Sequence, residues 1–390
     1  MTFQKLTIKD CCTIVSGSTP RTENRGFWNG DIQWATPKDL SDRNCQYIAE
    51  TNSQITQEGF DSCSTSMLPP YSVLFSSRAP IGLVAINTVP MCTNQGFKSL
   101  VPDSEKVHYK YLYYWLLKNK EYLQSLGNGA TFKELSKSSL ERVEIQLPSI
   151  PEQNRIAAIL DKAEEIKRKR EESLKLADEF LKSVFVDMFG DPVTNPMGWE
   201  TKPIGDCGKV ITGNTPSRKM PHYYGNHIEW IKSDNINTPS HFLSQSTEML
   251  SEEGQRVGRI APKGAVLITC IAGSPSCIGN AAIADHAVTF NQQINAFIPT
   301  YEEFGTFFYL MLFSNKKIIQ AASTNSMKGM VSKSTFQGIK ILFPPRKLIV
   351  DLHKIFQKVM GFNTKLNTSY TDSISCVKSL EQTFFSQSQN

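Results

Sequence analysis

One stretch limits the possible fold of this chain more than any other. From Glu152 to Phe189 the chain has no glycine and no proline, and Pro151 stands just before it, where a helix can begin without losing a hydrogen bond. Apolar or small residues recur there at helical spacing, at Ile156, Ile159, Ala163, Ile166, Ala177, Phe180 and Val184. The pattern predicts a helix of about 38 residues, roughly 57 Å long. Its single narrow apolar stripe requires a partner of similar length.

The C-terminal segment provides that partner. Pro344 and Pro345 precede it, as Pro148 and Pro151 precede the first helix. Apolar or small residues at the same spacing then follow, at Leu352, Ile355, Val359, Phe362, Leu366, Tyr370, Ser373, Val377, Leu380 and Phe384. We expect the two helices to pack against each other as a coiled coil.

The two predicted helices close two similar segments of chain. At an offset of 196 residues, Gly17-Ser18-Thr19-Pro20 aligns with Gly213-Asn214-Thr215-Pro216, and Trp34 aligns with Trp230. Further along, Ser136-Lys137-Ser138 aligns with Ser332-Lys333-Ser334. Matches in the same order over a full half of the chain indicate an internal duplication.

The duplication predicts an α+β fold with four segments. Residues 1–148 and 191–343 are each long enough for a core of their own, and both contain short strand-like apolar runs, such as 72–76 and 265–269. Residues 149–190 and 344–390 are the long helices. We therefore expect two globular α/β domains separated by a helix pair, with an internal pseudo-two-fold repeat.

The composition excludes several classes of protein. With 40% hydrophobic and 20% charged residues, the chain is globular rather than disordered, and it has neither an apolar run long enough for a membrane span nor a signal peptide. Nine cysteines without CxxC spacing indicate reduced thiols of a cytoplasmic protein. The net charge is only +5, so any DNA-binding surface depends on how the charges are distributed.

Each half opens with a turn that carries hydroxyl and basic side chains. Glycine and proline favour such a turn, and small hydroxyls beside a cation suit contact with a phosphate. A plain surface turn is the alternative. The candidate DNA contacts are Ser18, Thr19 and Arg21 in the first half, and Asn214, Thr215, Arg218 and Lys219 in the second.

An aromatic segment follows each turn. Trp34 and Trp230 lie in strand-like alternation, which favours a place in the core over base stacking. The polar loops that come next, 36–39 and 232–235, carry the candidate DNA contacts Lys38, Lys232 and Asn235. Asn235 has an amide of the kind that binds adenine through two hydrogen bonds.

Later loops add further candidates. Arg78 has no cation opposite it in the second half, which offers Ser274 and Ser276 there, so this is a candidate point of different specificity. The amides at 94–95 and 291–292 either contact DNA or cap a buried turn, and the turn is favoured. Small residues, hydroxyls and lysines at matching places make the following loops the best DNA-facing candidates, through Thr131, Lys133, Lys137, Lys328 and Lys333.

No catalytic motif is recognisable. The GxSxG, HExxH and P-loop patterns are absent. Residues 195–199 are similar to the Asn-Pro-Pro-aromatic motif of adenine methyltransferases, but they lack its second proline, and no glycine-rich cofactor loop accompanies them. His222 and His227 have no third ligand nearby, so no metal site is expected. These observations favour a binding protein.

The run Pro-Ser-Ile-Pro-Glu-Gln-Asn-Arg-Ile-Ala-Ala-Ile-Leu at 148–160, the two-half layout and the Gly-x-Thr-Pro turns resemble the specificity subunit of type I restriction–modification systems. The second copy of the motif, at 343–352, lacks the Glu-Gln pair. The resemblance covers the whole chain. It implies that residues 1–148 and 191–343 are target recognition domains, that each reads half of a split DNA site, and that the long helices pack antiparallel as a spacer.

The resemblance also implies partners. Two modification subunits, which bind S-adenosylmethionine and methylate adenine, are expected to dock on this chain, with Glu152, Gln153 and Arg155 as docking residues. Restriction subunits would complete the nuclease. This chain itself is expected to bind no cofactor and to be non-catalytic.

Three alternatives stay open. A non-DNA scaffold of two β-rich domains on a coiled-coil strut would show no salt-dependent duplex binding. A solitary DNA methyltransferase, the weaker interpretation, would bind cofactor as an isolated chain. The basic run 167–170 is either a contact with spacer phosphates or a solvated face balanced by neighbouring glutamates, and the second is favoured.

Overall fold

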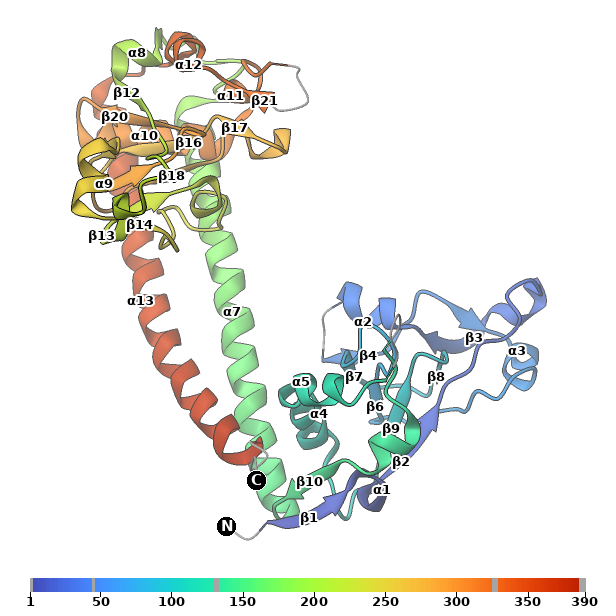
Figure 1. Ribbon diagram of the computed structural model, residues 1–390. Coiled ribbons are helices and arrows are strands. Elements are labelled where there is room, and N and C mark those ends of the chain that lie inside the picture. Colours follow the sequence, from blue (N-terminus) through green and yellow to red (C-terminus); the bar gives the residue numbers. More distant parts are fainter. Residues whose placement is uncertain (1–2, 44–45, 129–132, 325–328, 386–390) are drawn as a thin grey trace. The chain divides into compact units, whose positions relative to one another are not determined.

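The computed structural model describes residues 3–43, 46–128, 133–324 and 329–385, which belong to two compact units (Figure 1). Unit 1 comprises Met1–Lys169 with Thr368–Asn390, and unit 2 comprises Arg170–Asn367. Each unit therefore combines one globular half with part of each long helix. Within the described ranges, no helix has the length and apolar character needed to cross a membrane.

Unit 1 contains ten strands among its described residues. They are β1 (Gln4–Thr7), β2 (Cys12–Ser16), β3 (Trp28–Ala35), β4 (Tyr47–Ile48), β5 (Gln54–Ile55), β6 (Val73–Phe75), β7 (Val84–Asn87), β8 (Cys92–Thr93), β9 (Lys98–Pro102) and β10 (Glu144–Leu147). The short helices are α1 (Ile8–Cys11), η1 (Arg25–Phe27), α2 (Pro37–Arg43), α3 (Gln57–Asp61), α4 (Tyr109–Lys118), α5 (Lys120–Ser125) and α6 (Lys137–Glu141). The strands form sheets in the orders β2-β9-β6-β7-β4, β5-β3-β8 and β1-β10.

Unit 2 repeats most of this order of elements, with several short strands that differ. Its described strands are β11 (Thr201–Pro203), β12 (Gly208–Thr212), β13 (Tyr224–Ile231), β14 (Met249–Leu250), β15 (Ile260–Ala261), β16 (Val266–Thr269), β17 (Ile271–Ala272), β18 (Ala281–Ile283), β19 (Val288–Phe290), β20 (Ile294–Pro299), β21 (Gly329–Met330) and β22 (Lys340–Leu342). The short helices are α8 (Ile204–Cys207), η2 (Pro221–Tyr223), η3 (Ser233–Asn235), α9 (Glu252–Val257), η4 (Pro275–Cys277), α10 (Glu302–Ser314), α11 (Lys317–Gln320) and α12 (Lys333–Gly338). The sheets run β12-β20-β16-β18, β14-β13-β19-β15, β11-β22 and β17-β21.

The duplication extends to an irregularity of the backbone. Strand β3 pairs antiparallel with β5 and parallel with β8, and β13 pairs in the same two ways with β14 and β19. Both antiparallel pairs shift register, between Trp28 and Ile32 in unit 1 and between Tyr224 and Ile228 in unit 2. Since the two units share a bulge as well as an order of elements, the predicted repeat is confirmed.

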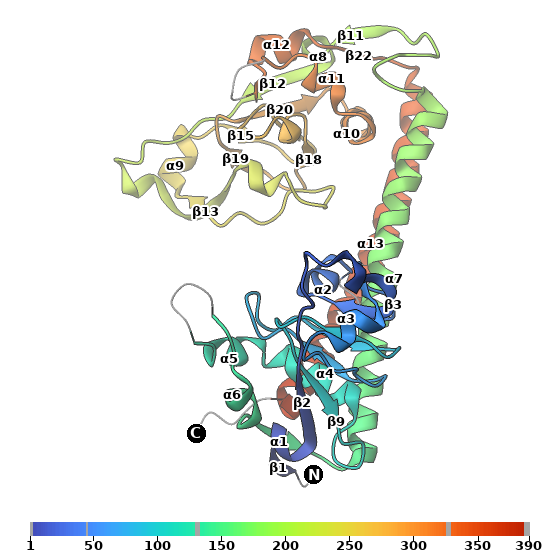
Figure 2. The same cartoon turned by 90° about the vertical axis from the view of Figure 1, so that its right-hand side faces the viewer.

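The two predicted long helices are present as α7 (Ile150–Phe189) and α13 (Arg346–Phe385). In unit 2 they lie side by side (Figures 1 and 2), and Phe185 of α7 shares a core with Leu352 and Phe356 of α13. In unit 1 the other ends meet, because Ile156 of α7 shares a core with Phe385 of α13. The helices therefore run in opposite directions.

The buried side of α7 differs from the predicted stripe. Ile156 is buried as expected, but Ile166 and Phe180 are 40% and 51% exposed. In unit 2 the buried positions are instead Leu181, Phe185 and Phe189, which step by four. Each part of α7 packs on the globular core of its own unit as well as on α13, so the buried side follows that core rather than one continuous seam.

The basic run in the middle of α7 has acidic neighbours one turn away. Lys169 lies 2.7 Å from Glu165, and Lys167 lies 3.9 Å from Glu164. Hydrogen bonds from Lys162 and Lys169 lower the pKa of Glu165 to about 2. This arrangement fits the solvated face that the sequence favours for this run.

Candidate nucleic-acid interface

A tryptophan anchors the opening turn in each unit. Trp34 and Trp230 are buried, 6% and 3% exposed, which confirms their predicted place in the core. Each indole N–H also donates to a turn carbonyl, from Trp34 to Ser18 O at 3.0 Å and from Trp230 to Asn214 O at 3.2 Å. The same residue therefore fills the core and positions the candidate DNA-contacting turn.

The turns themselves lie tightly against the neighbouring strand connection. A Cβ on Gly17 would lie 2.0 Å from the carbonyl oxygen of Asn94, and one on Gly213 would lie 2.1 Å from that of Asn291, so neither position accepts a side chain. The Thr19 hydroxyl donates to the Gln95 side chain. In unit 2, Thr215 makes the matching hydrogen bond to Gln292. The amides at these places therefore brace the turn, as the sequence favours.

The basic residues after the turns differ between the units. Arg21 and Lys38 of unit 1 are exposed, as is Lys219 of unit 2. Arg218 and Lys232 of unit 2 instead meet at one carboxylate, that of Glu248. Ser18 is half-buried in its turn.

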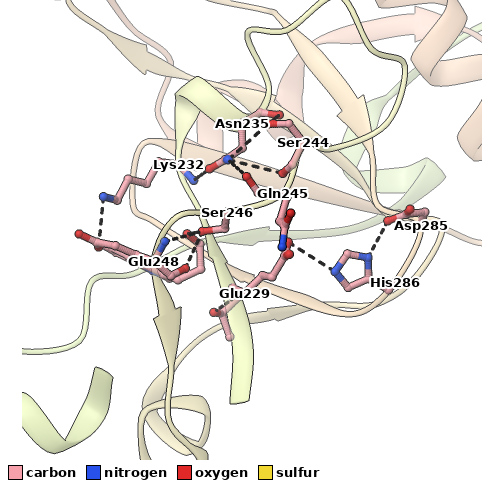
Figure 3. A network of polar contacts seen from close by, with 11 residues as sticks. Glu229, Lys232, Asn235, Ser244, Gln245, Ser246, Glu248, Asp285 and His286 are labelled. Atoms are coloured by element: carbon pink, nitrogen blue, oxygen red, sulfur yellow. Dashed lines mark hydrogen bonds and ion pairs between the residues drawn. The ribbon is translucent and has the colours of Figure 1, made fainter. Parts of the chain in front are cut away.

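Glu248 binds both Arg218 and Lys232 through the same oxygen. Its Oε2 lies 2.8 Å from an Arg218 guanidinium nitrogen and 3.1 Å from Lys232 Nζ; Figure 3 shows the second contact. The Arg218 guanidinium lies 4.4 Å from the ring centre of Tyr224 and 5.2 Å from that of Trp230. The Arg218 hydrogen bond, with Lys232 adding to it, lowers the pKa of the Glu248 carboxyl against the opposing effect of burial.

Asn235 does not present its amide to solvent. It is 7% exposed, its Oδ1 accepts the Lys232 backbone N–H at 3.0 Å, and its Nδ2 donates to Gln245 O at 3.1 Å (Figure 3). At the equivalent place in unit 1, Asp39 accepts the Thr36 backbone N–H at 2.8 Å. The position closes a turn in both units, so the expected adenine contact is not available in this conformation.

The Asn214 amide is also used within the protein. Its Nδ2 donates to Val257 O at 2.9 Å, and its Oδ1 accepts the Arg259 backbone N–H at 2.8 Å. The side chain therefore ties the opening turn to the last residue of α9 and to the segment that follows. Like that of Asn235, its predicted DNA contact would require these internal hydrogen bonds to break.

Two candidate loops that are distant in sequence meet in each unit. In unit 1, Arg78 pairs with Glu134 in the backbone and through its side chain, at 3.0 Å. In unit 2, β17 pairs with β21 at the same place. Lys133 is exposed beside Glu134, whereas Thr131 and Lys328 lie outside the described residues.

Lys137 and Lys333 stand at the starts of α6 and α12. Both side chains are exposed. The serines before them cap the helices, because Ser136 Oγ accepts from Ser139 N and Ser332 Oγ accepts from Thr335 N, each at 3.1 Å. Both lysines are therefore held at the same place in the repeated frame, as the matching Ser-Lys pairs predict.

The expected docking residues at the start of α7 divide into two kinds. Gln153 is fully buried, accepts His108 N at 2.8 Å, and donates to Lys106 O and Pro148 O at 2.9 Å. It therefore holds the helix start to its own domain, and the predicted docking contact through this side chain would require these hydrogen bonds to break. Glu152 and Arg155 form a surface ion pair at 2.6 Å.

Sequence reasoning missed Glu248. The fixed offset of 196 pairs it with Asn52, but the strands show a local offset of 195, because Trp34 N donates to Ser53 O and Trp230 N donates to Glu248 O. At that register, unit 1 has a serine where unit 2 has the carboxylate. An alignment of the two halves that allowed a one-residue shift at this place would have paired Glu248 with Ser53 and shown the difference in charge.

Comparison with known proteins places this frame in a family. The sequence model of the type I restriction modification DNA specificity domain matches residues 1–176 and again 196–369. The MjaIX specificity subunit of Methanocaldococcus jannaschii is 41% identical over 232 residues, 55% of this chain and 53% of that protein. The HindI specificity subunit of Haemophilus influenzae is 31% identical over 175 residues, 43% of this chain and 37% of that protein. The chain thus aligns with about half the length or less of these curated relatives.

Solved structures share the fold over nearly the whole chain. The S subunit of a type I restriction–modification system from M. genitalium gives a TM-score of 0.63 at 14% identity, covering 99% of this chain and 97% of that one. A chain from a structural study of type I complex assembly gives a TM-score of 0.56 at 17% identity, with 98% and 97% covered. Because the family model matches both halves, this chain belongs to the type I restriction–modification DNA specificity family.

Proposed function

We propose that this chain is the non-catalytic, sequence-specific DNA-binding subunit of a type I restriction–modification complex and that it reads a bipartite target. Residues 1–148 and 191–343 are the two target recognition domains in this proposal, and 149–190 with 344–390 form the spacer. The observation that carries it is the repeated frame. Trp34 and Trp230 anchor equivalent turns, yet the side chains around those turns differ between the units.

The physical argument is that a shared frame with different loops suits two related but different recognitions. Phosphate contacts place a protein on the duplex, and side chains that reach base edges distinguish sequences. Exposed cations are present on the candidate loops of both units, at Arg21, Lys38, Lys219, Lys137 and Lys333. Each unit therefore carries both a rigid support and groups that can bind DNA.

The same proposal assigns the chemistry to partners. Two modification subunits that bind S-adenosylmethionine would methylate adenine, and restriction subunits would cut DNA, all in the cytoplasm. The Glu152–Arg155 ion pair at the start of α7, in which Arg155 is exposed and Glu152 is partly buried, is a candidate docking contact.

The test is selection of DNA by the assembled complex. This chain is co-expressed with its modification subunits, and the complex selects from a random duplex library at moderate salt, followed by sequencing. Two short fixed motifs at a constant spacing are expected. An intact complex that enriches no motif would instead support a scaffold without DNA specificity.

A further inference from the structure

The carboxylate of Glu248 stands where an anion would bind between two cations. Arg218 and Lys232 converge on its Oε2 at 2.8 and 3.1 Å. The Arg218 distance is typical of a charge-assisted hydrogen bond to a carboxylate or phosphate oxygen, and Lys232 forms an ion pair with the same oxygen. Tyr224 and Trp230 lie against the guanidinium, and Trp230 lies 5.3 Å from Lys232 Nζ. The two cations are therefore held in place by rings as well as by the carboxylate.

The rings are themselves fixed to the frame. Tyr224 donates its hydroxyl to Pro216 O at 2.7 Å, and Trp230 is buried and donates to Asn214 O. On the other side, the Ser246 hydroxyl lies within hydrogen-bond distance of the backbone carbonyls of Trp230 and Glu248, at 2.9 and 2.5 Å, and can donate to either. The positions of Arg218 and Lys232 thus rest on groups that would stay in place if the carboxylate turned away.

Unit 1 lacks all three charges at the corresponding places. The repeat puts Thr36 opposite Lys232 and Thr22 opposite Arg218 at the offset of 196, and the strand hydrogen bonds put Ser53 opposite Glu248. The repeated frame does not need Arg218, Lys232 and Glu248 in order to fold, because the equivalent turn of unit 1 forms without charged residues at these places. The three charges are therefore a specific property of the second unit.

We propose that Arg218 and Lys232 form a binding site for a DNA backbone phosphate and that Glu248 occupies this site in the free protein, so that DNA binding exchanges the carboxylate for a phosphate. This inference rests on the proposed function, since it takes the second unit to bind DNA. Glu248 then weakens binding of the second unit to any duplex. It acts as an internal competitor and does not read a base.

The exchange is energetically accessible. The side chains of Arg218, Lys232 and Glu248 are 55%, 31% and 34% exposed, and ion pairs of this exposure contribute only about 0–1 kcal/mol. A phosphate offers the same geometry to both cations. Rotation of one glutamate side chain is enough to open the site.

The test compares three single variants of the full chain, and the double variant of Glu248→Gln with Arg218→Gln, in complex with its modification subunits. Glu248→Gln removes the competing charge and keeps the shape of the side chain. Arg218→Gln removes one cation of the site. Glu253→Gln is the matched control, because it removes one exposed negative charge of the same unit that pairs with His222 rather than with Arg218 or Lys232.

Duplex affinity is measured at several salt concentrations, with DNA that contains the selected target and with DNA that does not. For Glu248→Gln we expect roughly five-fold tighter binding to both duplexes and a log–log salt slope steeper by up to about 0.9, the contribution of one phosphate contact. Arg218→Gln should weaken binding and flatten the slope, and it should do so more strongly when Glu248 is already glutamine. Glu253→Gln should change affinity less than two-fold.

Two results would overturn the inference. If Glu248→Gln binds no more tightly than Glu253→Gln, the carboxylate does not compete with DNA. If Glu248→Gln instead loses the preference for one base of a single motif, the carboxylate reads a base. The selected motifs of the unaltered complex are determined in parallel, so failure of the proposed function, with no motif at all, is distinguishable from failure of this inference alone.

Discussion

At the scale of single residues, side chains that look available in the sequence are often used within the fold. Asn214, Asn235 and Gln153 all place their amides in internal hydrogen bonds. Sequence reasoning could not decide this, because an amide suits a backbone turn as well as a base edge. The exposed lysines at 38, 137, 219 and 333, by contrast, are where the loop pattern predicts them.

Substitution of Trp34 and Trp230, one at a time, tests whether each tryptophan positions the opening turn of its own unit. Trp230→Phe keeps most of the ring but removes the hydrogen bond to Asn214 O, which is worth about 1 kcal/mol. The second turn should then be less well held, and DNA selection should show weaker enrichment of one motif only. Trp34→Phe, which removes the bond to Ser18 O, should weaken the other motif. A parallel loss of both motifs from either variant would contradict separate anchoring.

Gln153 and Arg155 distinguish a structural from a docking residue. Gln153→Leu leaves buried partners of three hydrogen bonds unsatisfied and should lower the free energy of unfolding by about 3 kcal/mol. Arg155→Ala alters an exposed side chain, so stability should change by less than about 0.5 kcal/mol, while retention of the modification subunits falls. Urea denaturation and co-purification measure the two effects. Equal loss of stability in both variants would refute this division.

At the scale of elements, the pattern of apolar residues predicted both long helices, and the family resemblance predicted their antiparallel direction. The pattern did not predict which side of α7 is buried. Periodicity reports that a helix has an apolar side, but here the globular cores compete with α13 for that side, and Leu181 and Phe185 are buried where Phe180 was expected. The list of apolar positions has a gap between Ile166 and Ala177, where Arg170 and Ser173 stand at the helical spacing, and this gap was the sign that no single apolar stripe continues along the helix.

Alanine substitutions in α7 measure that difference. Phe185 is fully buried, so Phe185→Ala should lower the free energy of unfolding by about 3–5 kcal/mol. Phe180 is 51% exposed, so Phe180→Ala should cost less than about 1 kcal/mol. Thermal or urea unfolding of the two variants gives the comparison. If Phe180→Ala lowers the free energy of unfolding more than Phe185→Ala does, the buried side of α7 is the one that the sequence predicts.

At the scale of the whole molecule, the duplication was the part of the structure that the sequence predicted best. Matched turns, strands and long helices recur at nearly constant offsets, because the frame depends on glycines, tryptophans and apolar periods that are visible in the chain. The difference on which the proposed phosphate site depends, Ser53 against Glu248, lies at a one-residue shift in register that the strand pairing reveals. The repeated frame can therefore be recognised from residue spacing in the sequence, whereas this difference between the units becomes clear only in the structure.

The central claim is that two units with the same repeated fold recognise DNA separately. One measurement tests this claim most directly. Residues 191–343 are replaced by the corresponding segment of a family member with a different target, and the complex with its modification subunits selects duplexes from a random library. We predict that one of the two motifs changes while the other motif remains the same. If both motifs change together, or if neither changes, the two units do not read DNA independently.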